Sequence, residues 1–358
     1  MDGAQTLVMA FAAPEMTDDR RAFAELAAAY PGSVVVGCSS SGEIAQDQVS
    51  DATVSVGIAR FASTAVRSVV ETVDEAGSSE AVGKALGEQL SGEGLRAVLV
   101  LSDGLNVNGT ALSAGLQAAV GNHVVVTGGL AGDGARFGAT WVYAHGELGD
   151  HRVVAVGLYG DKLQVGHGSR GGWDVFGPPR TVTKSEGNVL FSLDGRPALE
   201  LYKEYLGERA SGLPATALLF PLALRDPAAP ERELVRTILA VDEDTQSMTF
   251  AGDVPQGAQV QLMRANMERL VDGAASAADL SLGSLGSSGP VFAVAISCVG
   301  RRLVLGEATE EEVEATLETF PEGSVQVGFY SYGELSPTEG GTCELHNQTM
   351  TLTALREA

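Results

Sequence analysis

Cysteine is scarce in this chain of 358 residues, which contains only Cys38, Cys298 and Cys343. Their number is odd, and their spacings match neither a zinc motif nor a disulfide framework. The sequence therefore argues against a disulfide-stapled fold and against a cysteine-rich metal site. It predicts three reduced thiols.

Long apolar runs are missing as well. No run reaches the roughly 18 residues that a membrane-spanning helix needs. The N-terminus, MDGAQTLVMAFAA, begins with an acid where a signal peptide would have a basic region, so its apolar part is interpreted as a buried strand. We expect a cytoplasmic protein that has no membrane partner.

Positive charge is in short supply. Lys and Arg together number 23, only four of them Lys, against 46 acidic residues, which gives a net charge of −23. This charge repels nucleic-acid phosphates and anionic lipid surfaces. The function classes that depend on nucleic-acid or membrane binding are therefore excluded, and the acidic excess is interpreted as a means of solubility.

Aromatic residues make up only 6% of the chain, whereas apolar residues make up 44% and Gly occurs 45 times. This composition is typical of an ordinary α/β protein and not of a fibrous or disordered one. Because the length exceeds what one hydrophobic core usually holds, we expect two domains.

One short pattern occurs twice, nearly three hundred residues apart. Residues 37–44 read GCSSSGEI and residues 328–335 read GFYSYGEL. In both places an aromatic-Pro breaker and Ser-Val-x-Val-Gly come before the pattern. A looser third copy, GGLAGD, occupies residues 128–133, with Asp133 in the position of the Glu.

The segments around the copies share one order of elements. A strand, a helix and a second strand come before each pattern, and a further strand follows it, as the apolar and capping patterns indicate. A short crossover favours parallel pairing of the two flanking strands, and the following strand can return antiparallel. The sequence predicts an α/β fold of two related domains, built from duplicated strand-helix-strand units with mixed β-sheets. The predicted strands and helices are 7–12, 18–29, 33–37 and 53–61; 97–102, 110–120, 123–127, 140–143 and 153–159; and 291–298, 310–319, 324–328 and 348–355.

Polar side chains at the repeated turn are the first candidates for a ligand site. At the carboxyl end of a strand they would face the crevice where open α/β sheets bind ligands. The glutamates could accept hydrogen bonds from an amino group. The alternative is structural, with Ser and Glu satisfying the amide groups of the turn itself. These candidates are Ser40, Ser41, Glu43, Ser331, Tyr332 and Glu334.

A second group of candidates lies near these turns or in the C-terminal stretch CELHNQT (343–349). An arginine could bind a ligand carboxylate through two hydrogen bonds, or else form an internal ion pair. If residues 343–348 form a strand, Cys343 and His346 face opposite sides, which argues against a zinc site there. The second group is Cys38, Asp133, Arg136, Arg180, Cys298, His346 and Asn347.

Enzyme templates match poorly. The stretch from Gly37 to Gly42 has four residues between its glycines, whereas a nucleophile elbow has three. No Gly-Lys-Ser/Thr phosphate loop is present. An enzyme acting on a small metabolite stays open only as an alternative.

Taken together, the motifs VVVGCSSSGEI, TGGLAGD, SCVGRR, GFYSYGEL and LHNQT, in this order, resemble the FIST family of sensory proteins. The stretch FGPPRTVTKSEGN resembles the join between its two domains. The resemblance implies a FIST N-terminal domain over residues 1–185, a connector at about 166–190, and a FIST C-terminal domain over 190–358.

The same resemblance implies a cytoplasmic sensor that binds a small ligand, an amino acid or a similar polar metabolite, in a cleft between the duplicated halves. Its implied partners are histidine kinases of two-component signalling, chemotaxis receptors or cyclic-dinucleotide enzymes. We expect the output to pass to a separate protein, and the leading interpretation requires no cofactor.

Some family members are described as haem proteins that sense nitric oxide, which is the alternative function. Haem needs an axial ligand in a dry pocket, and His is a common one. His123, His145 and His151 fall at turns or strand entries, so His167 and His346 are the candidates that remain.

Overall fold

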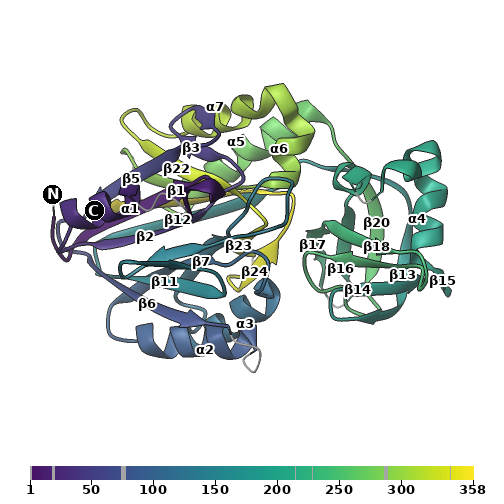
Figure 1. Cartoon of the computed structure of the whole chain (residues 1–358), viewed down its shortest axis with the longest axis horizontal. Coiled ribbons are helices and arrows are strands. Elements are labelled where there is room, and N and C mark those ends of the chain that lie inside the picture. Colours follow the sequence, from purple (N-terminus) through teal and green to yellow (C-terminus); the bar gives the residue numbers. More distant parts are fainter. Residues whose placement is uncertain are drawn as a thin grey trace.

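The computed structural model of this chain describes residues 2–17, 21–73, 78–213, 215–227, 229–285, 289–338 and 340–358. Figure 1 shows a larger and a smaller lobe. The predicted fold class, α/β with two domains and mixed sheets, is confirmed. In the described part of the chain, residues 2–170 and 267–358 supply the three sheets of the larger lobe, and residues 174–264 supply the sheet of the smaller one.

Three strand-helix-strand units form the larger lobe. In each unit the first strand pairs in parallel with the second and antiparallel with a returning strand, as predicted. Residues 18–20, where the first helix was predicted to begin, lie outside the described residues. The first unit is β1 (Thr6–Ala12), α1 (Arg21–Ala29), β2 (Val34–Ser39) and β5 (Val54–Arg60). The second is β7 (Leu95–Ser102), α3 (Gly109–Val120), β8 (Val125–Leu130) and β11 (Arg152–Tyr159). The third is β21 (Phe292–Cys298), α7 (Thr309–Thr319), β22 (Val325–Ser331) and β25 (Met350–Glu357), with α6 (Val299–Leu305) between β21 and α7.

The units exchange strands in a cycle. β3 (Glu43–Ala45), which follows the first turn, pairs with β22 of the third unit. β23 (Gly333–Pro337), which follows the turn at residues 328–335, pairs with β8 of the second unit. β9 (Val142–Ala144), which comes after the turn at residues 128–133, pairs with β2 of the first unit. Each turn therefore carries the chain from its own sheet into that of another unit.

One core joins the three sheets, and helices cover their outer faces. Residues of β1, β7 and β22, each from a different sheet, belong to the same apolar cluster, as Met9, Leu99 and Phe329 illustrate. α2 (Ser79–Leu90) and α3 pack on the second sheet, while α5 (Met267–Gly283) and α7 lie on the third. The sheets are completed by β4 (Gln48–Ser50), β6 (Ala65–Thr72), β10 (Glu147–Gly149), β12 (Leu163–Arg170) and β24 (Cys343–His346).

The smaller lobe is an antiparallel sheet that packs against α4 (Ala198–Leu206) and has its own apolar core. Leu199 and Tyr202 of α4 are buried in that core. Its strands are β13 (Asp174–Glu186), β14 (Val189–Leu193), β15 (Arg196–Pro197), β16 (Leu222–Asp226), β17 (Ala229–Arg236), β18 (Ile238–Asp242), β19 (Ser247–Phe250) and β20 (Gln259–Arg264).

The lobes do not follow the linear division predicted at about residues 166–190. β12 stays in the larger lobe because it pairs along its whole length with β25. The chain crosses to the smaller lobe at Gly171–Trp173, inside the predicted connector, and returns after β20. The last ninety or so residues then complete the sheets of the larger lobe. A turn-rich stretch predicts a crossing, but sequence patterns carry no sign of the return.

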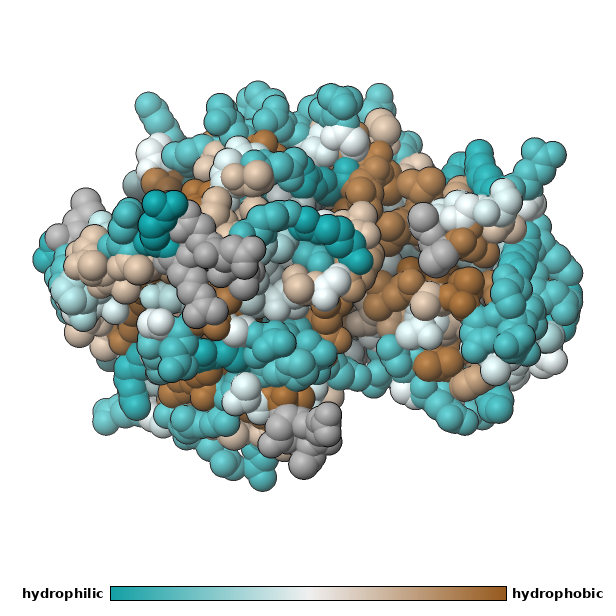
Figure 2. Space-filling model, viewed as in Figure 1, coloured by the Kyte–Doolittle hydropathy of each residue, from teal (hydrophilic) through white to brown (hydrophobic). Residues whose placement is uncertain are grey.

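Figure 2 shows hydrophilic side chains over most of the visible face and hydrophobic ones gathered where the lobes meet. Leu303 of α6 and Leu219 of the 3-10 helix η3 (Ala215–Leu219) are 45% and 41% exposed.

None of the helices in the described ranges has both the length and the apolar character required to span a bilayer.

Candidate functional site

The two matching turns lie against each other. The backbone N–H of Ser41 donates to the carbonyl of Tyr330 at 2.8 Å, and the N–H of Tyr330 donates to the carbonyl of Gly42 at 2.9 Å. The third copy joins them, because the N–H of Gly132 donates to the carbonyl of Ser39 at 3.1 Å. The turns therefore meet inside the larger lobe, hydrogen-bonded to one another.

The glutamates of the two turns make the same set of contacts. Glu334 accepts hydrogen bonds from the hydroxyl of Ser331 at 2.7 Å and from the N–H and hydroxyl of Thr349 at 3.2 and 3.0 Å. Glu43 accepts the equivalent bonds from the hydroxyl of Ser40 and from the N–H and hydroxyl of Thr53. Each acid thus ties its turn to the residue in front of the returning strand.

Asp133, the acid of the third copy, has backbone partners. Its carboxylate accepts hydrogen bonds at 2.8 Å from the N–H groups of Gly138 and Ala139, and one from the hydroxyl of Tyr332. The hydroxyl of Ser41 accepts from the N–H of Gly134 at 2.9 Å. All six polar candidates of the two turns are buried. Their contacts are those of the structural interpretation, in which the motif satisfies its own backbone.

The other predicted residues are dispersed. Cys38 and Cys298 are buried, and burial raises the pKa of both thiols. Arg136 forms an ion pair with Glu15 at the surface. The remaining two lie elsewhere: Arg180 pairs with Asp194 in the smaller lobe at 3.1 Å, and the buried Asn347 donates to the carbonyl of His346 at 3.0 Å.

Burial raises the pKa of Glu334 to about 8. An unfolded glutamate has a pKa of about 4.3, so this side chain should lower the stability of the fold as the pH rises from about 4.3 to about 8. Glu334→Gln removes the buried charge. We expect it to raise the melting temperature relative to wild type more at pH 9 than at pH 6. Circular dichroism measures the two melting temperatures. If Glu334→Gln exceeds wild type by no more at pH 9 than at pH 6, the expectation is contradicted.

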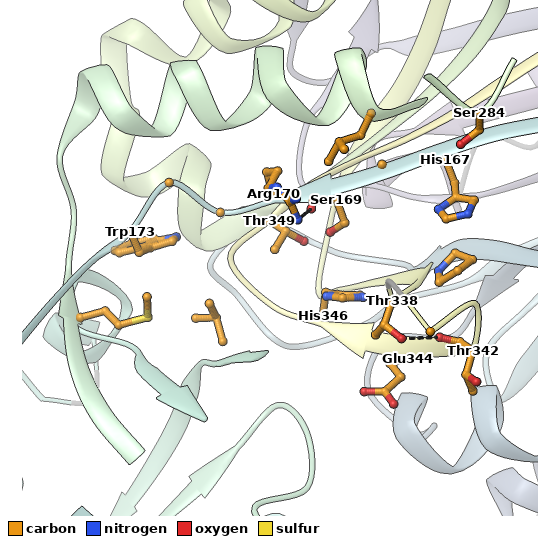
Figure 3. Close-up of a pocket in the computed structure, with 18 residues that line it drawn as sticks. His167, Ser169, Arg170, Trp173, Ser284, Thr338, Thr342, Glu344, His346 and Thr349 are labelled. Atoms are coloured by element: carbon orange, nitrogen blue, oxygen red, sulfur yellow. Dashed lines mark hydrogen bonds between the residues drawn. The ribbon is translucent and has the colours of Figure 1, made fainter. Parts of the chain in front are cut away.

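A pocket of about 800 Å³ lies between the lobes. Two stretches form most of its wall: residues 167–173, which end β12 and cross to the smaller lobe, and seven described residues between 337 and 349, in and around β24. Val235 and Met263 of the smaller lobe and Leu280 of α5 complete it. In Figure 3, Trp173 lies at one end, His167 and Ser284 at the other, and His346 and Thr338 between them.

The wall divides into a polar and an apolar part. Arg170, Ser169 and Thr349 supply a guanidinium group and two hydroxyls, and they lie together in Figure 3. The apolar part, made by Trp173, Val235 and Met263, belongs to one buried cluster. Such a wall can hold an anionic group at one end and an apolar group at the other.

Both histidines left by the sequence line this pocket. Burial lowers the pKa of His167, which favours the neutral imidazole. His346 Nε2 lies 3.1 Å from the carbonyl oxygen of Ser336, so this nitrogen carries the proton. The predicted alternation also holds, because Cys343 faces the core whereas Glu344 and His346 face the pocket.

The sequence indicates none of Ser169, Arg170 and Trp173 as candidates, and from the stretch CELHNQT (343–349) it indicates His346 and Asn347 but not Thr349. The two segments that supply most of the wall are about 170 residues apart, and neither has a recognisable binding motif. Their meeting depends on the pairing of β12 with β25. The available signals are the Gly-Pro-rich stretch after His167, which predicts a connector, and the polar stretch CELHNQT (343–349).

Comparison with known families finds two domain models, in the order that the sequence predicted. The family model for the FIST N domain matches residues 6–196, and that for the FIST C domain matches residues 198–337. Uncharacterized proteins of Mycobacterium tuberculosis strains CDC 1551 and H37Rv are 27% identical over 241 residues, 63% of this chain. The match spans 60% of the length of these curated relatives.

Proposed function

Because this chain belongs to the FIST family, whose domains are sensory domains in signal transduction, we propose that it senses an amino acid or similar polar metabolite in the pocket between its lobes. The observation that carries the proposal is the wall of that pocket, with Arg170 and hydroxyls on one part and Trp173 on another. This moves the proposed ligand site away from the repeated turns, because none of their six polar candidates lines the pocket. It assigns no reaction to the site.

The wall suits the two ends of an amino acid. A guanidinium group can bind a carboxylate through two parallel hydrogen bonds, which fits Arg170. An apolar side chain would lie against Trp173, Val235 and Met263, where contact with the indole ring and the thioether removes apolar surface from water. The volume of about 800 Å³ is within the range of small-ligand sites.

A signal would follow from the position of the pocket. Val235 and Met263 belong to the smaller lobe, whereas His167 and His346 belong to the larger one. A ligand that contacts both lobes favours the arrangement in which both contacts form, and it shifts the population only by that difference in affinity. We propose that a separate signalling protein, such as a histidine kinase, a chemotaxis receptor or a cyclic-dinucleotide enzyme, detects this shift.

A thermal-shift screen of the twenty L-amino acids and their 2-oxo acids tests the proposal. A compound at 100 times its Kd should stabilise the native state by about 2.7 kcal/mol, which raises the melting temperature measurably. Arg170→Gln should abolish most of that rise, because it removes the carboxylate partner. Arg180→Gln, in an ion pair outside the pocket, is the control and should retain it. The proposal fails if no compound raises the melting temperature.

One observation favours haem as a second candidate ligand: His167 and His346 line the same pocket. The residues fit in part. His167 is held neutral by burial and suits an axial ligand, whereas His346 would have to release the Ser336 carbonyl to coordinate through Nε2. Bound haem would supply the iron that takes up a diatomic gas. Haem titration followed by visible absorption tests this, and His167→Ala should abolish a Soret band.

A further inference from the structure

Thr349 separates Glu334, the buried glutamate of the turn at residues 328–335, from the pocket. It lines the pocket and is 6% exposed, while the carboxylate of Glu334 behind it is fully buried. Its backbone N–H and its hydroxyl both point at the same carboxylate oxygen, Oε2 of Glu334, at 3.2 and 3.0 Å. The carboxylate of Glu334 therefore reaches the pocket wall through Thr349.

This contact fixes the direction of the Thr349 hydroxyl. A hydroxyl has one hydrogen to donate and two lone pairs that accept. Oε2 of Glu334 accepts a hydrogen bond from the Thr349 N–H, so its lone pairs face Thr349. The same oxygen accepts a second hydrogen bond from the Thr349 hydroxyl. Oε1 accepts from the Ser331 hydroxyl at 2.7 Å, so the Ser331 and Thr349 donors serve different oxygens of the carboxyl group. With its hydrogen directed to Oε2, the Thr349 hydroxyl has lone pairs left for the pocket and for the Thr351 hydroxyl, which lies 3.4 Å away.

The hydroxyl of Ser169, by contrast, can donate into the pocket. Thr351 donates to Ser169 Oγ at 3.0 Å, so the hydrogen of Ser169 is left for an acceptor in the pocket. Arg170, next in the chain, supplies only donors. The polar wall thus places donors for a carboxylate beside an acceptor for a second group.

We infer that Glu334 is a specificity-determining residue of the pocket: it makes Thr349 a pure acceptor and so selects ligands with an α-ammonium group over their 2-oxo counterparts. This inference rests on the proposed function. A 2-oxo acid would place a carbonyl oxygen against lone pairs, leaving two acceptors face to face, whereas an ammonium group donates.

The first turn provides an internal control. Glu43 accepts from the N–H and hydroxyl of Thr53 as Glu334 does from Thr349, yet Thr53 is not part of the pocket wall. A variant there removes the same kind of internal hydrogen bond. Any effect on ligand choice that appears at Thr349 and not at Thr53 comes from the pocket and not from the turn.

Calorimetric titration with three pairs of probes tests the inference: L-leucine, L-phenylalanine and L-glutamate, each with its matching 2-oxo acid. In Thr349→Val we expect an amino acid that binds the wild type to bind about 10-fold more weakly, because a hydrogen bond to a charged group is lost. The 2-oxo acid should change by less than about twofold. Thr53→Val should behave as wild type. Glu334→Gln, whose amide oxygen can still face both Thr349 donors, should retain the preference for the amino acid.

The outcomes separate the two proposals. If an amino acid binds wild type and Thr349→Val equally, the pocket function stands and the role of Glu334 and Thr349 is refuted. An equal loss for the amino acid and its 2-oxo acid also refutes it, because polarity then makes no difference. If the wild type binds neither these probes nor any compound of the thermal-shift screen, the amino-acid function and this inference both fall.

Discussion

Arg301→Met alone is expected to lower the free energy of unfolding by about 3–5 kcal/mol. The guanidinium group is fully buried and pairs with Glu312, also fully buried, at 2.7 Å. It also donates to the carbonyls of Gly171 and, at 2.8 Å, of Leu270. Removing it leaves a buried carboxylate without its cation, and two carbonyls lose a donor. Chemical denaturation followed by far-ultraviolet circular dichroism measures the change.

The double variant Arg301→Met, Glu312→Gln is the matched control. It removes both charges, while the amide can still accept from the hydroxyls of Ser297 and Tyr330, which lie 2.9 and 2.7 Å from Glu312. We expect it to be more stable than Arg301→Met, because an unpaired buried charge costs more than none. A single variant that costs less than about 1 kcal/mol, or a double variant that is less stable still, would contradict the role given to this pair.

Gly328→Ala is expected to lower the free energy of unfolding by about 3 kcal/mol, the upper part of the range for overpacking in a core. A Cβ built on Gly328 would lie 1.7 Å from the carbonyl oxygen of Ala295 on the neighbouring strand β21. Gly328 lies in β22, which pairs with β21 on one edge and with β3 on the other. Backbone on both sides therefore prevents β22 from shifting. The strands must separate to admit a methyl group.

The same position recurs in the other units. A Cβ on Gly37 would lie 2.1 Å from the Ala10 oxygen, and one on Gly128 would lie 2.0 Å from the Val100 oxygen. The control is Gly283→Ala near the end of α5, which has no atom within 4 Å of its Cβ position and should be nearly neutral. Equal stability of Gly328→Ala and Gly283→Ala, in the same denaturation experiment, would contradict the close approach.

The repeated motif now has a physical explanation. Its first glycine allows the backbone of the second strand to approach the first one, as at Gly37 and Gly328. Its acid ties the turn to the return strand, as Glu43 does to Thr53 and Glu334 to Thr349. Between them the chain leaves one sheet and enters another. The pattern is therefore that of a strand-exchanging turn.

Local patterns were enough to predict the units. Apolar strands and aromatic-Pro breakers predicted β1, β2, β21 and β22 to within a few residues, and the short crossovers predicted their parallel pairing. These features depend on neighbours in the chain. The exchange of β3, β9 and β23 between units is a long-range choice of partner, and a three-residue strand such as β3 carries no information about it.

The candidate site was harder to predict, for a related reason. Buried serines and glutamates that satisfy a turn have the same composition as a ligand site, so Ser40 and Glu43 could not be assigned from residue type. The pocket is formed by residues such as Arg170 and Thr349, whose segments are distant in sequence. His346 was a candidate as part of the polar C-terminal stretch, and alternation along a strand, which is local, correctly predicted that it and Cys343 face opposite sides.

The most direct test of the account is a crystal structure of the protein with the amino acid that raises its melting temperature most. We expect the compound between the lobes, with its carboxylate on Arg170, its ammonium group on Thr349 and its side chain toward Trp173. Density for the compound at residues 37–44 or 328–335, or anywhere outside this pocket, would contradict the assignment.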